Sequence, residues 1–88
     1  MADIEIYSTA VCPYCIAAKN LLKARGLDWR ELRIDTDPAA RATMLERAPG
    51  ARTVPQVFIN GVHVGGFDQL AAADRSGRLN ELLSRDRQ

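Results

Sequence analysis

The first third of the chain changes its hydrophobic period twice. Apolar positions that alternate over residues 4–8 predict a strand, and apolar positions at helical spacing over about 13–25 predict a helix. Gly26 follows this helix, at the place where a left-handed C-terminal residue belongs. Residues 27–34 then predict a second strand, in which Trp29 is out of phase with the later apolar positions and marks an irregular start. A strand, helix and strand in this order require parallel strands joined by a right-handed crossover.

A second helix is predicted from its two ends and from one apolar stripe. Asp37 is a favoured N-cap residue, and Pro38 after it suits the first helical position. Pro49 and Gly50 predict the end of this helix. The apolar stripe consists of Met44, Leu45 and Ala48. We therefore expect this helix to bury one side only.

The strongest local signal is a hairpin centred on Asn60 and Gly61. These two residues separate short apolar, β-prone runs at 57–59 and 62–64. Asn-Gly suits a two-residue turn in which both φ angles are positive. The third and fourth strands are therefore predicted to be antiparallel neighbours.

The remainder of the chain has a helical pattern. Residues 65–66, both glycine, end the hairpin, and a third helix is predicted from about 67 to 76. Gly77 separates this helix from a last apolar turn, which contains Leu79, Leu82 and Leu83. We expect residues 84–88 to be frayed.

The predicted order is β-α-β-α-β-β-α, which indicates an α/β fold with a mixed four-stranded sheet and helices on both faces. The chain has 88 residues and shows no linker, repeat or low-complexity segment, so residues 1–88 are expected to form a single domain. A domain of this size buries only about 60% of the surface that its unfolded chain exposes, and its core must be small.

Composition and charge exclude several classes of partner. The 12 basic and 11 acidic residues are spread along the chain and give a formal net charge of +1, so no single-sign field would steer the protein to nucleic acid or anionic lipid. No apolar run suits a signal peptide or a membrane span. Two cysteines three positions apart cannot form the framework of a small secreted domain. We therefore expect a cytoplasmic protein with no nucleic-acid or membrane partner.

The two cysteines, Cys12 and Cys15, allow three interpretations: a metal site, a structural disulfide or a working dithiol. A structural zinc site needs four ligands, and the chain adds only His63, which lies between two valines and is expected to face solvent. A structural disulfide that closes so short a loop would restrict the unfolded chain little. We therefore expect no metal and interpret the pair as a dithiol that performs chemistry.

The place of Cys12, where a strand passes into a helix, favours its thiolate. Free backbone N–H groups and the helix dipole meet there, and the dipole alone could lower the thiol pKa by roughly 1.5 units. Cys15 should be more buried, keep a higher pKa and act as the resolving cysteine. Lowering a thiol pKa to about 5 raises the thiolate fraction some 30-fold, but a weaker intrinsic nucleophile offsets this gain. The low pKa therefore helps mainly when Cys12 leaves a mixed disulfide.

Three blocks carry a family resemblance that covers nearly the whole chain. They are C-P-Y-C at 12–15, T-V-P-Q-V-F-I at 53–59 and G-G-F-D at 65–68. In this order and spacing they make the chain closely resemble the dithiol glutaredoxins of the thioredoxin-like fold. The resemblance implies a cis peptide bond between Val54 and Pro55 that faces Cys12. Such a bond would turn the Val54 N–H and C=O toward an incoming peptide.

The resemblance also implies that this peptide is glutathione. The implied contacts are Tyr14, Thr53, Val54, Pro55, Gly66, Phe67 and Asp68. The γ-glutamyl carboxylate would rest on the N–H groups of Phe67 and Asp68, and the Asp68 side chain would meet the ammonium group. The chain departs from many relatives at Thr9, where they carry a lysine, and at Phe67, where they carry a further cysteine. Arg41 and Arg52 are possible substitutes for the missing charge, although the favoured interpretation of each is a solvated surface residue.

The function implied by the resemblance is that of a monomeric, glutathione-dependent thiol-disulfide oxidoreductase. It would reduce protein–glutathione mixed disulfides and protein disulfides, with glutathione as reductant and co-substrate. One alternative is a carrier of a glutathione-ligated 2Fe-2S cluster, but cluster-binding relatives usually have glycine or serine where this chain has Pro13. Another is a dedicated electron donor recharged by thioredoxin reductase, which the G-G-F-D block disfavours.

Overall fold

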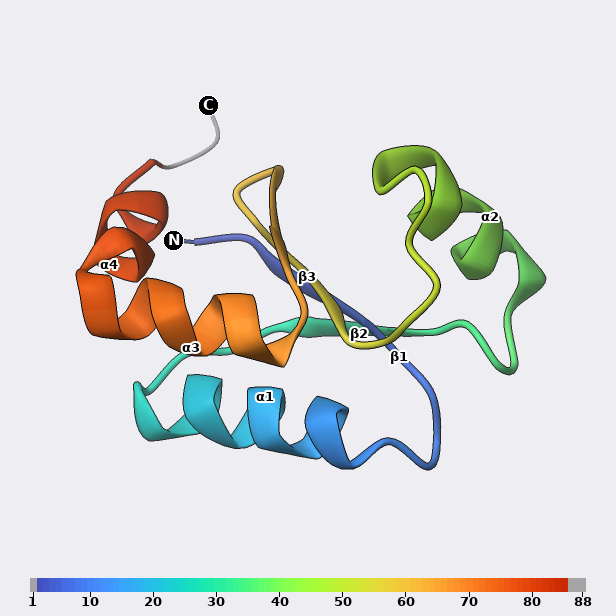
Figure 1. Ribbon diagram of the computed structural model, residues 1–88, viewed down its shortest axis with the longest axis horizontal. Helices are drawn as coiled ribbons and strands as arrows, with labels where there is room; N and C mark the ends of the chain where they lie inside the picture. Colours follow the sequence, from blue (N-terminus) through green and yellow to red (C-terminus); the bar gives the residue numbers. More distant parts are fainter. Residues whose placement is uncertain (1, 86–88) are drawn as a thin grey trace.

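The computed structural model describes residues 2–85, and Figure 1 shows a central sheet covered by helices. The elements are β1 (Ile4–Ser8), α1 (Pro13–Ala24), β2 (Arg30–Arg33), α2 (Pro38–Arg47), β3 (Gln56–Ile59), β4 (Val62–Gly65), α3 (Phe67–Ser76) and α4 (Arg78–Leu83). The predicted order of elements is confirmed. The structure adds α4, which the sequence indicated only as an apolar turn.

The four strands form one mixed sheet in the order β2-β1-β3-β4. β1 and β2 are parallel, so the residues that follow Ser8 and Arg33 lie at the same edge of the sheet. β3 is antiparallel to β1 and to β4. Asn60 and Gly61 have φ angles of 50° and 82°, which confirms the predicted hairpin turn. The start of β3 therefore meets the end of β1, and both border the segment that leads into α1.

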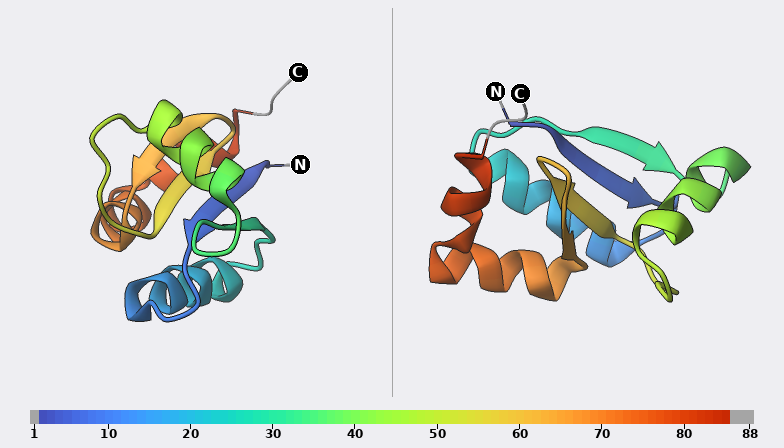
Figure 2. Two further views of the ribbon diagram at one scale, coloured as in Figure 1. Left: turned by 90° about the vertical axis from the view of Figure 1, so that its right-hand side faces the viewer. Right: turned by 90° about the horizontal axis from the view of Figure 1, so that it is seen from above.

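Each face of the sheet has its own apolar cluster, because successive side chains of a strand point to opposite faces. Ile4 and Ile6 of β1 pack on the side of α1, α3 and α4, whereas Tyr7 packs on the side of α2. The larger cluster contains Ile4, Ile6, Ala18, Leu22, Val57, Ile59, Leu70, Ala73, Leu79 and Leu82. The smaller one contains Tyr7, Ala40, Met44, Ala48 and Phe58. Figure 2 shows α2 apart from the other helices, which agrees with the prediction of helices on both faces.

Three predicted details are corrected. The second strand is Arg30–Arg33 and not 27–34, and Trp29, which was expected to mark its irregular start, lies directly before it and packs against the larger cluster. Leu45 is 41% exposed, so the buried stripe of α2 is formed by Met44 and other residues. In the tail, Ser84 and Arg85 continue the hydrogen bonding of α4. Residues 86–88 of the predicted frayed tail lie outside the described residues.

Between residues 2 and 85, no helix combines the length and the apolar character that crossing a membrane requires.

Candidate functional site

The two cysteines lie at the start of α1. Cys12 is the N-cap of this helix, and its Sγ accepts a hydrogen bond from the Cys15 N–H at 3.1 Å. Cys15 is fully buried, whereas Cys12 is 7% exposed. The two residues form a disulfide, with 5.2 Å between their Cα atoms. The predicted place of Cys12 at a helix N-terminus and the deeper burial of Cys15 are confirmed.

The segment before Cys12 is held by a side chain from the neighbouring strand's end. Asp35 Oδ2 accepts a hydrogen bond from the Ala10 N–H at 3.0 Å, and Arg33 donates to both Asp35 oxygens at 2.9 and 2.8 Å. The Arg33 guanidinium and, after it, the Ala10 N–H hold the pKa of the Asp35 carboxyl well below its usual range. The sequence prediction did not include Asp35. Its position directly beyond a strand parallel to β1 is the signal that could have found it.

The segment before β3, residues 53–55, places its backbone beside Cys12 and forms one wall of the site. The peptide bond between Val54 and Pro55 is cis, as the resemblance implied. The Val54 carbonyl oxygen lies 3.6 Å from Cys12 Sγ, and Pro55 is buried. A peptide backbone is therefore available directly beside the sulfur.

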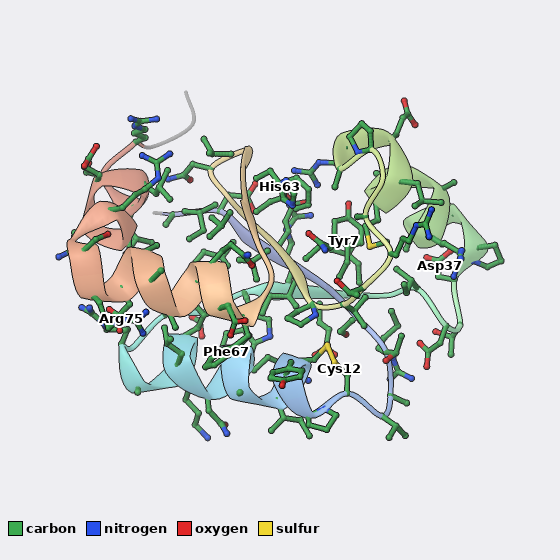
Figure 3. All side chains as sticks on the ribbon, viewed as in Figure 1. Tyr7, Cys12, Asp37, His63, Phe67 and Arg75 are labelled. Carbon is green, nitrogen blue, oxygen red and sulfur yellow. A yellow bond between two sulfur atoms is a disulfide. The ribbon has the colours of Figure 1, made fainter. Side chains whose placement is uncertain are left out.

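The start of α3 completes this side of the site. Gly66 is the N-cap of α3, and its N–H donates to Gln69 Oε1 at 2.9 Å. Gly65 has a φ angle of 121°, and a Cβ atom there would lie 3.1 Å from the Gln69 side chain. The Phe67 ring stacks on Tyr14 of α1, with 6.4 Å between ring centroids. Figure 3 shows Phe67 at the start of α3 on the same side of the molecule as Cys12.

An open pocket of about 380 Å³ lies between these segments. It is lined by Tyr14, Thr53, Val54, Pro55, Gly66, Phe67, Asp68 and Gln69. The structure thus brings together every residue predicted to contact a peptide ligand and adds Gln69, which the sequence prediction missed. A glutamine three residues after a helix N-cap is a recognisable capping signal. Cys12 borders the pocket through its contact with Val54.

Thr9, which stands where many relatives have a lysine, lies near the two arginines that could replace the charge of that lysine. Thr9, Arg41 and Arg52 line a second pocket of about 200 Å³, which shares Thr53 and Val54 with the first. Both arginines are exposed. The structure therefore places Arg41 and Arg52 in the same pocket as Thr9, and Thr53 and Val54 lie between this pocket and the first one.

His63 faces outward, as predicted, but it has partners. Its ring stacks on Phe58, with 4.8 Å between centroids, and its Nε2 lies 2.7 Å from Gln56 Oε1. Over residues 2–85, no group of three or more histidine, cysteine, aspartate or glutamate side chains is arranged to hold a metal ion.

Comparison with known proteins gives consistent matches. The glutaredoxin family model matches residues 4–64. A glutaredoxin of Pseudomonas aeruginosa is 49% identical over 84 residues, covering 96% of this chain and 99% of the relative. Glutaredoxin 3 of Escherichia coli K12 is 48% identical over 83 residues, covering 94% and 99%.

Solved structures give the same result. A solution structure of glutaredoxin from Brucella melitensis matches with a TM-score of 0.80 and 46% identity, over 94% of this chain and 89% of that one. The crystal structure of a buckwheat glutaredoxin–glutathione complex matches with a TM-score of 0.82 and 32% identity, over 94% and 77%.

Proposed function

Because this chain belongs to the glutaredoxin family of thiol oxidoreductases, we propose that it uses glutathione to reduce protein–glutathione mixed disulfides and protein disulfides. The observation that carries the proposal is the position of Cys12, which caps α1 beside a pocket formed by the Val54 backbone and the start of α3. The buckwheat relative was solved as a complex with glutathione, which supports glutathione as the ligand.

The pocket suits the charges of glutathione. The first-turn N–H groups of a helix have no partner within the helix, so Phe67 and Asp68 at the start of α3 can receive the γ-glutamyl carboxylate. The exposed Asp68 carboxylate can receive the ammonium group. Arg41 or Arg52, across the Thr53–Val54 wall, can supply the cation for the glycine carboxylate that Thr9 cannot.

Two thiol-disulfide exchanges would remove glutathione from a protein. The Cys12 thiolate attacks the glutathione sulfur, the protein thiolate leaves and takes up a proton, and Cys12 holds the glutathionyl group. A second glutathione thiolate then attacks that sulfur, releasing glutathione disulfide and the Cys12 thiolate. A helix N-terminus that stabilises this thiolate makes Cys12 a good leaving group in the second exchange.

A protein disulfide would need Cys15. Cys12 attacks one sulfur of the disulfide, and the Cys15 thiolate then attacks Cys12 and releases the reduced protein. The product is the Cys12–Cys15 disulfide, which is the form seen in the structure. Two glutathione molecules would return the pair to the dithiol and be oxidised to glutathione disulfide.

The test is a glutathione reductase-coupled assay on a glutathionylated peptide. Cys12→Ser should abolish turnover, whereas Cys15→Ser should retain most of it, because only Cys12 takes part in both exchanges. Asp68→Asn should lower kcat/KM about tenfold by removing one charged contact. Asp28→Asn, at an exposed position between α1 and β2, is the matched charge control. Turnover by Cys12→Ser, or a wild-type protein that transfers no glutathionyl group, would refute the proposal.

A further inference from the structure

The side of the sheet that faces α2 carries a connected set of polar and aromatic groups that ends at the pocket wall. The set begins at the buried Glu5, whose carboxylate receives two hydrogen bonds from Arg47 at 3.0 and 3.1 Å. Arg47 also donates to the Tyr7 hydroxyl at 3.0 Å, and its guanidinium lies 3.9 Å from the centroid of the Phe58 ring. Phe58 is thereby held in one place between β1 and the end of α2.

The next member of the set is His63, directly opposite Phe58 in the β3–β4 pairing. The stacking of His63 on Phe58 leaves its Nε2 2.7 Å from Gln56 Oε1. Gln56 and Phe58 are two residues apart in β3, so their side chains lie on the same face of the sheet. Figure 3 shows His63 and Tyr7 on the α2 side of the hairpin, where this set of groups lies.

The last member is Gln56, which is only 6% exposed although it is polar. Its Nε2 donates to the Thr53 carbonyl at 3.0 Å and so joins the residues on either side of Val54 and Pro55. Because the amide nitrogen of Gln56 faces Thr53, its oxygen must accept from His63, and we assign the His63 proton to Nε2. His63 thereby opposes a flip of the amide, which would place an oxygen against the Thr53 carbonyl.

We propose that Gln56 is a positioning residue for the exchange reaction: its amide, oriented by His63, fixes the Thr53–Pro55 wall on which a glutathionyl substrate aligns beside Cys12. Neither Gln56 nor His63 lines the 380 Å³ pocket itself, so each acts through Thr53 and not by contact with the ligand there. The expected loss of kcat/KM rests on the proposed function, whereas the expected ordering of residues 53–55 by Gln56 does not.

The main variant is Gln56→Met, which keeps the side-chain volume and removes both hydrogen bonds. We expect kcat/KM for a glutathionylated peptide to fall about fivefold, which corresponds to about 1 kcal/mol, the usual net value of the one hydrogen bond that reaches Thr53. The alkylation rate of the Cys12 thiolate by iodoacetamide should stay within about twofold of wild type, because a small reagent needs no aligned wall. A merely structural role would not separate these two rates.

His63→Ala is a second variant at an exposed position. It should cause a smaller loss of kcat/KM, about threefold, and no further loss when combined with Gln56→Met, since His63 acts through Gln56. Asn60→Gly is the matched control. It removes hydrogen bonds to the Asp3 N–H and the Leu82 carbonyl at the opposite end of β3, and glycine keeps the positive φ angle.

Backbone ¹⁵N relaxation separates failure of this inference from failure of the proposed function. Order parameters at Thr53 and Val54 should fall in Gln56→Met and His63→Ala but not in Asn60→Gly. If wild type transfers no glutathionyl group, the proposed function fails, and the relaxation data still decide the positioning role. Unchanged order parameters in both variants, additive losses in the double variant, or an equal kinetic loss in Asn60→Gly would overturn the inference.

Discussion

The starts of α1 and α2 are built alike but carry different capping atoms. Each helix has proline in its first turn, preceded by an N-cap residue with an extended backbone. In α2, Asp37 Oδ1 accepts the Ala39 N–H at 3.0 Å, and in α1, Cys12 Sγ accepts the Cys15 N–H at 3.1 Å. The same local structure therefore holds a carboxylate in one helix and a sulfur in the other.

The difference shows how one cap stabilises a fold and another prepares a reaction. A carboxylate is charged at neutral pH in any exposed setting, so capping by Asp37 only stabilises α2. A thiol becomes charged only on deprotonation, so the same N–H groups and dipole change the acid–base equilibrium of Cys12. Four predictions test this comparison.

The largest effect is expected from making the two caps identical. Cys12→Asp should lose at least about a thousandfold in glutathionyl transfer, because no nucleophilic sulfur remains at the helix start. The same variant should be more stable to urea, under reducing conditions, than Cys12→Ala by about 1 kcal/mol, because aspartate is a good cap. If the two variants were equally stable, the residue at position 12 would not cap α1 in the way that Asp37 caps α2.

The electrostatic part of the comparison can be sharpened with Thr9→Lys. A cation near the start of α1 should lower the Cys12 pKa by about one unit and raise the thiolate fraction of the reduced protein at neutral pH. The measurement is the pH dependence of alkylation by iodoacetamide. Asn20→Lys, an exposed position later in α1, adds the same charge away from the sulfur. An equal shift in both variants would contradict a local effect at the cap.

A smaller effect is expected at the α2 cap. Asp37→Ala should lower the free energy of unfolding by about 1 kcal/mol, whereas Asp37→Asn should change it little, since asparagine caps as well as aspartate. Neither substitution should alter glutathionyl transfer per folded molecule. Chemical unfolding together with the coupled assay measures both quantities. A loss of transfer in Asp37→Ala would mean that α2's cap also serves the site.

The smallest effect concerns the segment that leads into the α1 cap. The pKa of Asp35 is lowered by Arg33 and by the Ala10 N–H, so its carboxylate stabilises the fold above the ordinary aspartate pKa of about 3.9. This contribution disappears as the pH falls through the lower pKa of the folded state. Asp35→Asn should therefore lower Tm slightly at neutral pH and not at all in strong acid. A difference in Tm that grows toward acid would have the wrong sign.

Local signals in the sequence predicted those parts of the fold that residues within a few positions decide. Asn60 and Gly61 specify the hairpin turn because asparagine and glycine tolerate the positive φ angles that the turn requires. Asp37 specifies the start of α2 because its side chain hydrogen-bonds to the first turn of that helix. The early residues of the predicted second strand were wrong because periodicity cannot show where pairing with β1 begins. Trp29, directly before this start, packs against the larger cluster.

The candidate site was predicted in part, and for a different reason in each part. The start of α1 follows from the pattern around Cys12, whereas the wall at Val54 and Pro55 came only from the family resemblance. Asp35 was missed because its contact with Ala10 depends on β1 and β2 being neighbours in the sheet. Gln56 was missed because its hydrogen bonds to Thr53 and His63 depend on the course of the backbone around Pro55 and on side-chain positions that no sequence pattern gives.

The side chain of Asn60 has a consequence for engineering the protein. It accepts from the Asp3 N–H and donates to the Leu82 carbonyl, so one turn joins the first strand's approach to the last helix. This turn lies at the end of β3 opposite Pro55, and Figures 1 and 2 show the start of β1 and the end of α4 away from the start of α1. A domain fused before β1 or after α4 would therefore not obstruct the reactive sulfur.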